Sequence, residues 1–142
     1  MGLTREEMDK VVDDHFRFEA TDDIEGVMAS FVPDGPIMHE CVPSTVGILH
    51  DRGQMADFYK NLFACAKGEK ATMIRRFYGE DFLVDESVWK GRAPGRPFGL
   101  EGRDRPLEFR LLHVVEYAPD GRLKRENVWL DLAAILQQLP QG

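Results

Sequence analysis

The hydrophobic pattern changes its period halfway along the chain, and this change constrains the fold more than any other feature. In the first half, apolar residues recur at helical spacing in three segments, each preceded by residues that can cap a helix. Each apolar stripe leaves one polar side, so we expect the three helices to pack on one common surface. The capping pairs are Thr4 with Glu7, Asp22 with Glu25, and Asp51 with Gln54.

The second half has the composition of β-strands. Its apolar segments are rich in Val, Phe, Trp, Tyr and Leu, and Gly, Pro and Asp separate them. Helices followed by strands are typical of an α+β fold, with the helices on one face of a curved antiparallel sheet. The predicted strands are 37–42, 72–78, 82–90, 107–117 and 122–130, with a long loop over 91–106 and a final helix over 132–139.

A turn at residues 118–122 predicts how the last two strands pair. Its Pro-Asp-Gly sequence suits a type I turn followed by a left-handed glycine, which closes a hairpin with one bulge. Extending this register places His113 opposite Asn127, on a face that also carries Trp129 and Asp131. An aromatic face with a few isolated polar groups is typical of a pocket wall. A different bulge would reverse the faces.

Three of the four histidines are candidates for acid–base chemistry, because an imidazole can give or take a proton near neutral pH. His113 lies mid-strand, where structural burial and a pocket role are equally open. His15 lies on the apolar stripe of the first helix, where a hydrogen-bonded core histidine is the commoner case. His39 lies in the short strand. His50, beside the cap of the third helix, is expected to be exposed and has no predicted role.

Two carboxylates and three aromatic residues complete the predicted site. Asp131 ends the last strand, where it can cap the final helix, act as a base at the pocket rim, or do both. Glu86 can face solvent or the pocket. Trp129, Tyr59 and Phe63 are expected to form apolar walls around a ligand.

Composition excludes several classes of protein. The 142 residues carry 18 Lys and Arg against 25 Asp and Glu, so the net charge of −7 argues against a nucleic-acid partner. The chain has no apolar run long enough to span a membrane and no apolar stretch near its N-terminus, so we expect a cytoplasmic protein of one domain over 1–142. Cys41 and Cys65 are expected to be reduced structural thiols. No metal-ligand spacing or phosphate-binding loop is present, so no metal and no cofactor is predicted.

Four further segments are informative: Asp22–Phe31, Asp57–Phe63, Asp120–Asp131 and Leu136–Leu139. They resemble the SnoaL-like group within the nuclear transport factor 2 superfamily. The resemblance implies a cone-shaped α+β barrel with three N-terminal helices on the concave face of its sheet. It also implies cofactor-free chemistry and a homodimer formed through the outer sheet face, where Leu112, Val114, Val128 and Leu130 form an apolar band.

The resemblance also suggests roles for individual residues. Ketosteroid isomerases place a tyrosine and two aspartates where His15, His39 and His113 stand here, so steroid isomerase activity does not transfer directly. SnoaL-type cyclases resemble this chain in Asp131, which implies a general base. Scytalone dehydratase pairs a strand histidine with an asparagine on a neighbouring strand, and His113 and Asn127 resemble that pair. Relatives of limonene epoxide hydrolase need an Arg-x-Asp that this chain lacks.

These observations predict an enzyme that moves a proton next to a carbonyl, giving isomerisation, cyclisation or dehydration of a small apolar substrate. Asp131 or His39 would be the base, and His113, oriented by Asn127, would be the acid or oxyanion donor. One alternative is a non-catalytic module of the same fold that binds an apolar ligand or serves as a dimeric accessory subunit. Another is an epoxide hydrolase, which requires both Glu86 and Asp131 to point into the cavity.

Overall fold

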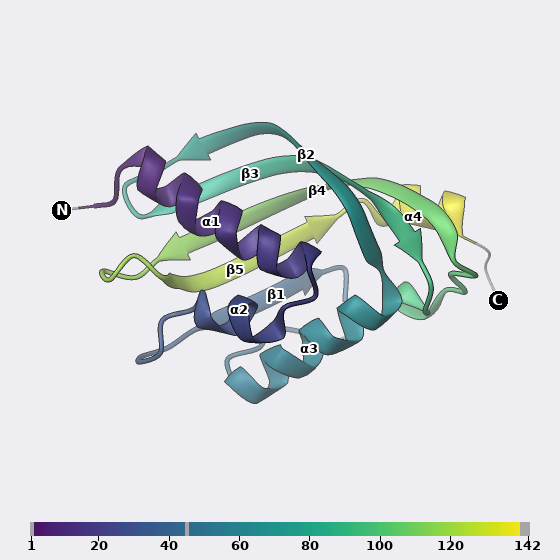
Figure 1. The fold of residues 1–142 in the computed structure, drawn as a ribbon, viewed down its shortest axis with the longest axis horizontal. Helices are drawn as coiled ribbons and strands as arrows, with labels where there is room; N and C mark the ends of the chain where they lie inside the picture. Colours follow the sequence, from purple (N-terminus) through teal and green to yellow (C-terminus); the bar gives the residue numbers. More distant parts are fainter. Residues whose placement is uncertain (1, 45, 140–142) are drawn as a thin grey trace.

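The structure is a computed structural model that describes residues 2–44 and 46–139, and Figure 1 shows the arrangement of its elements. The helices are α1 (Arg5–Ala20), α2 (Ile24–Ala29), α3 (Arg52–Cys65) and α4 (Leu132–Gln138), with a single 3₁₀ turn at Pro97–Gly99. The strands are β1 (Met38–Val42), β2 (Lys67–Tyr78), β3 (Phe82–Ala93), β4 (Arg105–Tyr117) and β5 (Leu123–Leu130).

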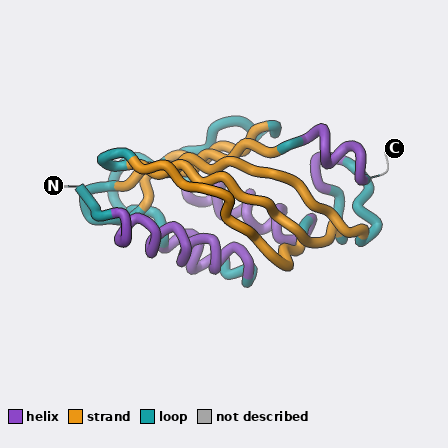
Figure 2. The backbone as a smooth tube through the Cα atoms, turned by 90° about the horizontal axis from the view of Figure 1, so that it is seen from above, coloured by secondary structure: helices purple, strands orange, loops and turns teal. Residues whose placement is uncertain are grey.

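The five strands form one curved, open sheet in the order β1-β5-β4-β3-β2. All neighbouring strands are antiparallel except β1, which pairs with β5 in parallel, so the sheet is mixed rather than wholly antiparallel. Figure 2 shows the strands as one curved layer with α1 along one side of it. We call that side the helix-covered face and the opposite side the outer face. The predicted α+β fold class is confirmed.

Local capping chemistry sets the helix starts. Thr4 and Glu7 form the predicted reciprocal capping box of α1, and the side chain of Asp51 caps α3. The cap of α2 is Asp23 rather than Asp22, because Asp22 adopts a left-handed backbone conformation (φ 55°) in the turn after α1. In the described part of the chain, every helix is too short or too polar to cross a membrane.

The turn between β4 and β5 forms as predicted. The backbone N–H of Ala118 donates to the carbonyl of Arg122 over 2.7 Å. Gly121 has the left-handed φ of 92° that this turn requires. Tyr117 then pairs with Leu123, so the hairpin begins in the expected register.

One residue further on, a bulge changes the faces of β5. Glu116 pairs with Arg125 instead of Lys124, so Lys124 is an extra residue on β5. Because side chains alternate along a strand, this insertion exchanges the two faces of everything that follows. Val128 and Leu130 therefore line the cavity on the helix-covered face, and the register predicted beyond the turn is wrong.

A buried ionic cluster ties α1 to the sheet. Arg76 of β2 donates from Nε to Asp85 of β3 over 2.7 Å, and its two terminal nitrogens reach Asp9 and Asp13 of α1 over 2.9 and 2.5 Å. Asp85 is fully buried, and Tyr78 also donates to Asp9. A buried carboxylate is tolerated only when its charge is paired in this way.

Removing the charge of Arg76 should therefore destabilise the fold. We expect Arg76→Met to lower the free energy of unfolding by about 3–5 kcal/mol, because Asp85 would keep a buried charge without its partner. Urea unfolding measures the change. The control is Arg75→Met, since Arg75 is 62% exposed and its ion pair with Glu86 is worth no more than about 1 kcal/mol. Equal effects of the two substitutions would show that the cluster is not a structural tie.

Candidate active site

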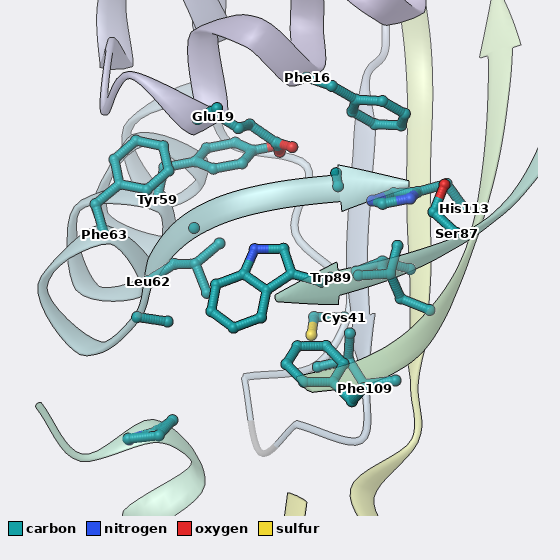
Figure 3. A pocket seen from close by; sticks show the side chains of 18 of the residues that line it. Phe16, Glu19, Cys41, Tyr59, Leu62, Phe63, Ser87, Trp89, Phe109 and His113 are labelled. Carbon is teal, nitrogen blue, oxygen red and sulfur yellow. The ribbon is translucent and has the colours of Figure 1, made fainter. Parts of the chain in front are cut away.

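An apolar cavity of about 270 Å³ lies between the helices and the helix-covered face of the sheet. Its walls are aromatic and aliphatic, and Trp89 and Phe109 stack on the sheet side with ring centroids 5.0 Å apart. Figure 3 shows these two rings opposite the helix residues Tyr59 and Phe63. Such a cavity suits an apolar molecule whose orientation is fixed by a few polar contacts.

The carboxylate of Glu126 lies at the inner end of this cavity, and its side chain is 1% exposed. Its Oε1 accepts a hydrogen bond from the hydroxyl of Tyr59 and lies 3.5 Å from Nε2 of His39. Its Oε2 lies 2.8 Å from Nε2 of His15 and 4.0 Å from Nε2 of His113. Four polar groups therefore surround one buried carboxylate.

Five different elements bring these groups together. His39 of β1 is the direct neighbour of Glu126 of β5, and His113 of β4 lies one diagonal step away on the same face. His15 comes from the buried side of α1 and Tyr59 from the buried side of α3. The periodicities of two strands and two helices thus converge on Glu126.

The charges of the cluster follow from its contacts. Burial alone would raise the pKa of Glu126, but the charge and hydrogen bond of His15, followed by His39, hold it well below its usual range. Burial alone would lower the pKa of His15, but Glu126 and Glu19 raise it to about 10. Burial and Glu126 raise the pKa of Tyr59 well above its usual value. At neutral pH the cluster therefore contains an anionic Glu126, a cationic His15 and a neutral Tyr59.

In both His39 and His113, the two nitrogens of the imidazole ring have different surroundings. In both rings Nδ1 is buried and has no hydrogen-bond partner among residues 2–44 and 46–139. Both residues line the cavity, and their Nε2 atoms lie on the Glu126 side. Nε2 is therefore the nitrogen that each imidazole can offer to a molecule in the cavity.

Other chemistries fit these residues less well. Ligand atoms of His15, Glu19 and Glu126 lie within 4.8 Å of one another, as a metal site would require. A metal-bound histidine almost always donates its second ring N–H to an acceptor, however, and Nδ1 of His15 has none in the part of the chain that the structure describes. Cys41 also lines the cavity, but burial followed by Glu126 raises its thiol pKa to about 12, so it is no nucleophile at neutral pH.

The structure brings together several of the residues that were predicted from the sequence. His39, His113, Tyr59 and Phe63 line the cavity. His15 lies behind Glu126 and contacts its carboxylate rather than the cavity itself. The catalytic and binding roles given to these residues remain predictions.

Four other predicted residues lie outside the cavity. Asn127 and Trp129 lie on the outer face because of the bulge at Lys124, and Asn127 donates there to Glu40 over 2.7 Å. Asp131 is exposed, and its side chain caps α4 by accepting from the backbone of Ala134. Glu86 also lies on the outer face, since it alternates with Asp85 and Ser87 on β3, and it pairs there with Arg75.

Sequence reasoning missed Glu126, the residue at the centre of the site. It follows Lys124 and Arg125, and such a charged run in a strand is typical of a solvated face. Only the bulge turns Glu126 inward, and no turn residue marks the position of that bulge. The one available signal was the set of three histidines in buried positions, which needs a counter-charge.

The pairing of His15 predicts how stability depends on pH. An unfolded histidine has a pKa of about 6.5, whereas Glu126 and Glu19 raise that of His15 to about 10 in the folded chain. The stability from this pairing is therefore complete below pH 6.5 and is lost as the pH rises through 10. The difference in unfolding free energy between wild type and His15→Gln, measured in urea from pH 6 to 10, should shrink as the pH rises. A constant difference would mean that His15 is neutral in the folded protein.

Comparison with known proteins identifies the fold. No protein-family model matches the sequence, and no curated protein matches it either. A candidate polyketide cyclase from Pseudomonas putida superposes with a TM-score of 0.79 at 14% identity, over 98% of this chain and 100% of that chain. A protein of ketosteroid isomerase-like fold from Catenulispora acidiphila, solved in complex with trimethylamine, gives 0.72 at 14% identity over 93% of each chain.

An LEH-like epoxide hydrolase from Mycobacterium tuberculosis has the same architecture. Its TM-score is 0.69 at 16% identity, over 94% of this chain and 89% of that chain. Neighbours with one fold and different names show that the fold accommodates several reactions. The chain therefore has the α+β cone fold of polyketide cyclase-like and ketosteroid isomerase-like proteins, which confirms the fold expected from the SnoaL-like resemblance.

Proposed function

We propose that the protein is a small-molecule enzyme that transfers a proton next to a carbonyl group of an apolar substrate. The observation that carries this proposal is the pair of imidazoles, His39 and His113, that flank the buried Glu126 carboxylate at the inner end of an apolar cavity. Removal and return of such a proton gives isomerisation, cyclisation or dehydration, depending on the substrate.

The two imidazoles have different positions relative to the carboxylate, which suggests different roles. His39 lies closer to Glu126, which favours a proton on its Nε2, so it would donate to the oxygen of the developing enolate. Nε2 of His113 lies 4.0 Å from the carboxylate and makes no hydrogen bond to it, so this nitrogen would take and return the proton. Glu126 stabilises the imidazolium that forms, as the carboxylate does in other histidine-based sites.

Glu126 itself is poorly suited to be the base. Its lone pairs are already engaged by Tyr59 and His15, and its pKa lies well below the usual range because of the neighbouring histidines. A carboxylate that binds protons so weakly abstracts them poorly from carbon. The electrostatic role of Glu126 is therefore separate from the proton transfer.

The cavity walls and the fold neighbours both favour an apolar carbonyl compound. The cavity is lined mainly by aromatic and aliphatic side chains and has room for a substrate of a few rings. The neighbours named as polyketide cyclase and ketosteroid isomerase-like suggest substrates of the same chemical kind. Epoxide opening is less favoured, because Glu86 and Asp131, the carboxylates it was expected to use, both lie outside the cavity.

Deuterium exchange tests the proposed proton transfer. The protein is incubated in D₂O with steroid enones, β-keto esters, aliphatic ketones and epoxides, and mass spectrometry follows label uptake and mass change. We expect label in a carbonyl compound and a loss of at least about 100-fold in rate for His113→Gln, the size typical of a lost acid–base group. Asp131→Asn is the matched control and should leave the rate unchanged, because Asp131 caps α4 and does not line the cavity.

The other outcomes separate the alternatives. Addition of water to an epoxide without exchange would favour the hydrolase. Tight binding of a panel compound without any reaction would favour a non-catalytic ligand-binding module. A rate that falls for Asp131→Asn but not for His113→Gln would contradict the assignment of His113.

We also propose that two copies associate through the outer face of the sheet. Val128 and Leu130 line the cavity, so they do not belong to the apolar band expected there. The band instead comprises Leu112, Val114 and Trp129, and Trp129 is 37% exposed. An indole so exposed beside other apolar side chains is typical of an interface.

Light scattering at micromolar concentration tests this association. The wild type should have the mass of a dimer, and Trp129→Arg should shift it to the mass of a monomer, because a charge would be buried at the interface. The control is Phe98→Arg, since Phe98 is similarly exposed, at 41%, but lies in the loop beside the cavity. A monomeric wild type would contradict the proposal.

A further inference from the structure

A further polar group lines the cavity beside His113, on the side away from the Glu126 carboxylate. The hydroxyl of Ser87 on β3 is buried in the cavity wall, with 7% of the residue exposed. Asp85 faces His113 across the β3–β4 ladder and Ser87 faces Leu111, so Ser87 and His113 are diagonal neighbours on one face. Figure 3 shows the two side chains next to each other.

The Ser87 hydroxyl already donates its only proton to another residue of the protein. Oγ of Ser87 donates to Oδ1 of Asp85 over 2.5 Å, and Oδ2 of Asp85 accepts from Nε of Arg76 over 2.7 Å. A carboxylate that is ion-paired with an arginine has no proton to give, so Asp85 can only accept. The single proton of Ser87 therefore lies on the Asp85 side.

Because Asp85 holds this proton, the Ser87 hydroxyl is only a hydrogen-bond acceptor towards the cavity. A hydroxyl has one proton and two lone pairs, so Ser87 can offer only its lone pairs to a molecule in the cavity. A ligand group that donates a hydrogen bond is satisfied there. A carbonyl or ether oxygen in the same place would face a second acceptor and would lose its own hydrogen bond with water.

We infer that Ser87 is a specificity-determining residue that accepts a hydrogen bond from a hydroxyl or N–H group of the substrate. This inference, which rests on the proposed function for the carbonyl, makes the substrate an apolar compound that carries a donor group as well as the carbonyl. His39 holds the carbonyl oxygen, and the donor group faces Ser87, which lies beyond His113 in the strand order. Arg76 and Asp85 act through Ser87 by holding its proton and are positioning residues.

Ser87 could instead serve only to satisfy the buried oxygen of Asp85, and binding measurements separate the two roles. The probes are 6-acetyl-2-naphthol, its methyl ether, and 2-acetylnaphthalene, which share a ring system and a ketone and differ in the donor group. Titration calorimetry gives their affinities for the wild type, Ser87→Ala and Ser87→Thr. Ser87→Cys, which keeps the size of the side chain, replaces Ser87→Ala if the latter does not fold.

We expect the wild type to bind the naphthol about 10-fold more tightly than either of the other probes, the usual size of one lost hydrogen bond. The preference should disappear in Ser87→Ala and persist in Ser87→Thr, which keeps the hydroxyl. A wild type without the preference, or a preference that survives Ser87→Ala, would overturn the inference. Loss of stability alone in Ser87→Ala would also do so, since a purely structural hydroxyl predicts that result.

The binding result is independent of the exchange assay. A preference that depends on Ser87, together with no exchange into any carbonyl compound, would support donor recognition and contradict the proposed proton transfer. Exchange that depends on His113, with no preference among the three probes, would support the proton transfer and overturn the role of Ser87.

Discussion

A carboxylate moved from water into a protein interior costs several kcal/mol unless other groups compensate for the lost hydration, and Glu126 is almost completely buried. Its compensation comes from the hydroxyl of Tyr59 on α3 and the imidazole of His15 on α1. Both helices must therefore sit against β5 in one particular arrangement for the chain to fold. The inner end of the cavity is defined by the same contacts, so stability and the geometry of the site depend on one interaction.

Helix α1 takes part in two ionic clusters, one around Glu126 and one around Arg76. Arg76 joins Asp85 of the sheet to Asp9 and Asp13, which lie six and two residues before His15 on α1. The helix is thus held to the sheet by charge at two places, and His113 lies beside both of them, opposite Asp85 and diagonal to Glu126. Two buried carboxylates that each need a fixed partner leave the floor of the cavity with little freedom to rearrange.

The parts of the fold that could be predicted are those set by local chemistry. Capping side chains such as Thr4 and Asp51 act within one helical turn, and the glycine of the β4–β5 turn acts within one hairpin loop. His15 and His113 could be placed on buried faces because the periods of α1 and β4 are regular up to those positions. The convergence of three histidines was therefore foreseeable, although its chemical reason was not.

The parts that could not be predicted follow from a single inserted residue. The bulge at Lys124 exchanges the faces of β5, so Glu126 enters the site while Asn127 and Trp129 leave it. A bulge costs little in local backbone energy, and its position is decided by which side chains the tertiary structure can satisfy. Here the bulge places the Glu126 carboxylate against His15, His39 and Tyr59. Tertiary electrostatics, which no local pattern encodes, thus decides the register.

The cavity combines polar groups of opposite kinds within apolar walls. Imidazole nitrogens with exchangeable protons stand beside Glu126, and a hydroxyl that can only accept stands at Ser87. Apolar surroundings strengthen both kinds of contact, because little water competes for them and the effective dielectric constant is low. The same surroundings make a mismatched ligand costly, since each unpaired polar group would be left without water. A cavity of this kind selects its ligand by the pattern of donors and acceptors at least as much as by shape.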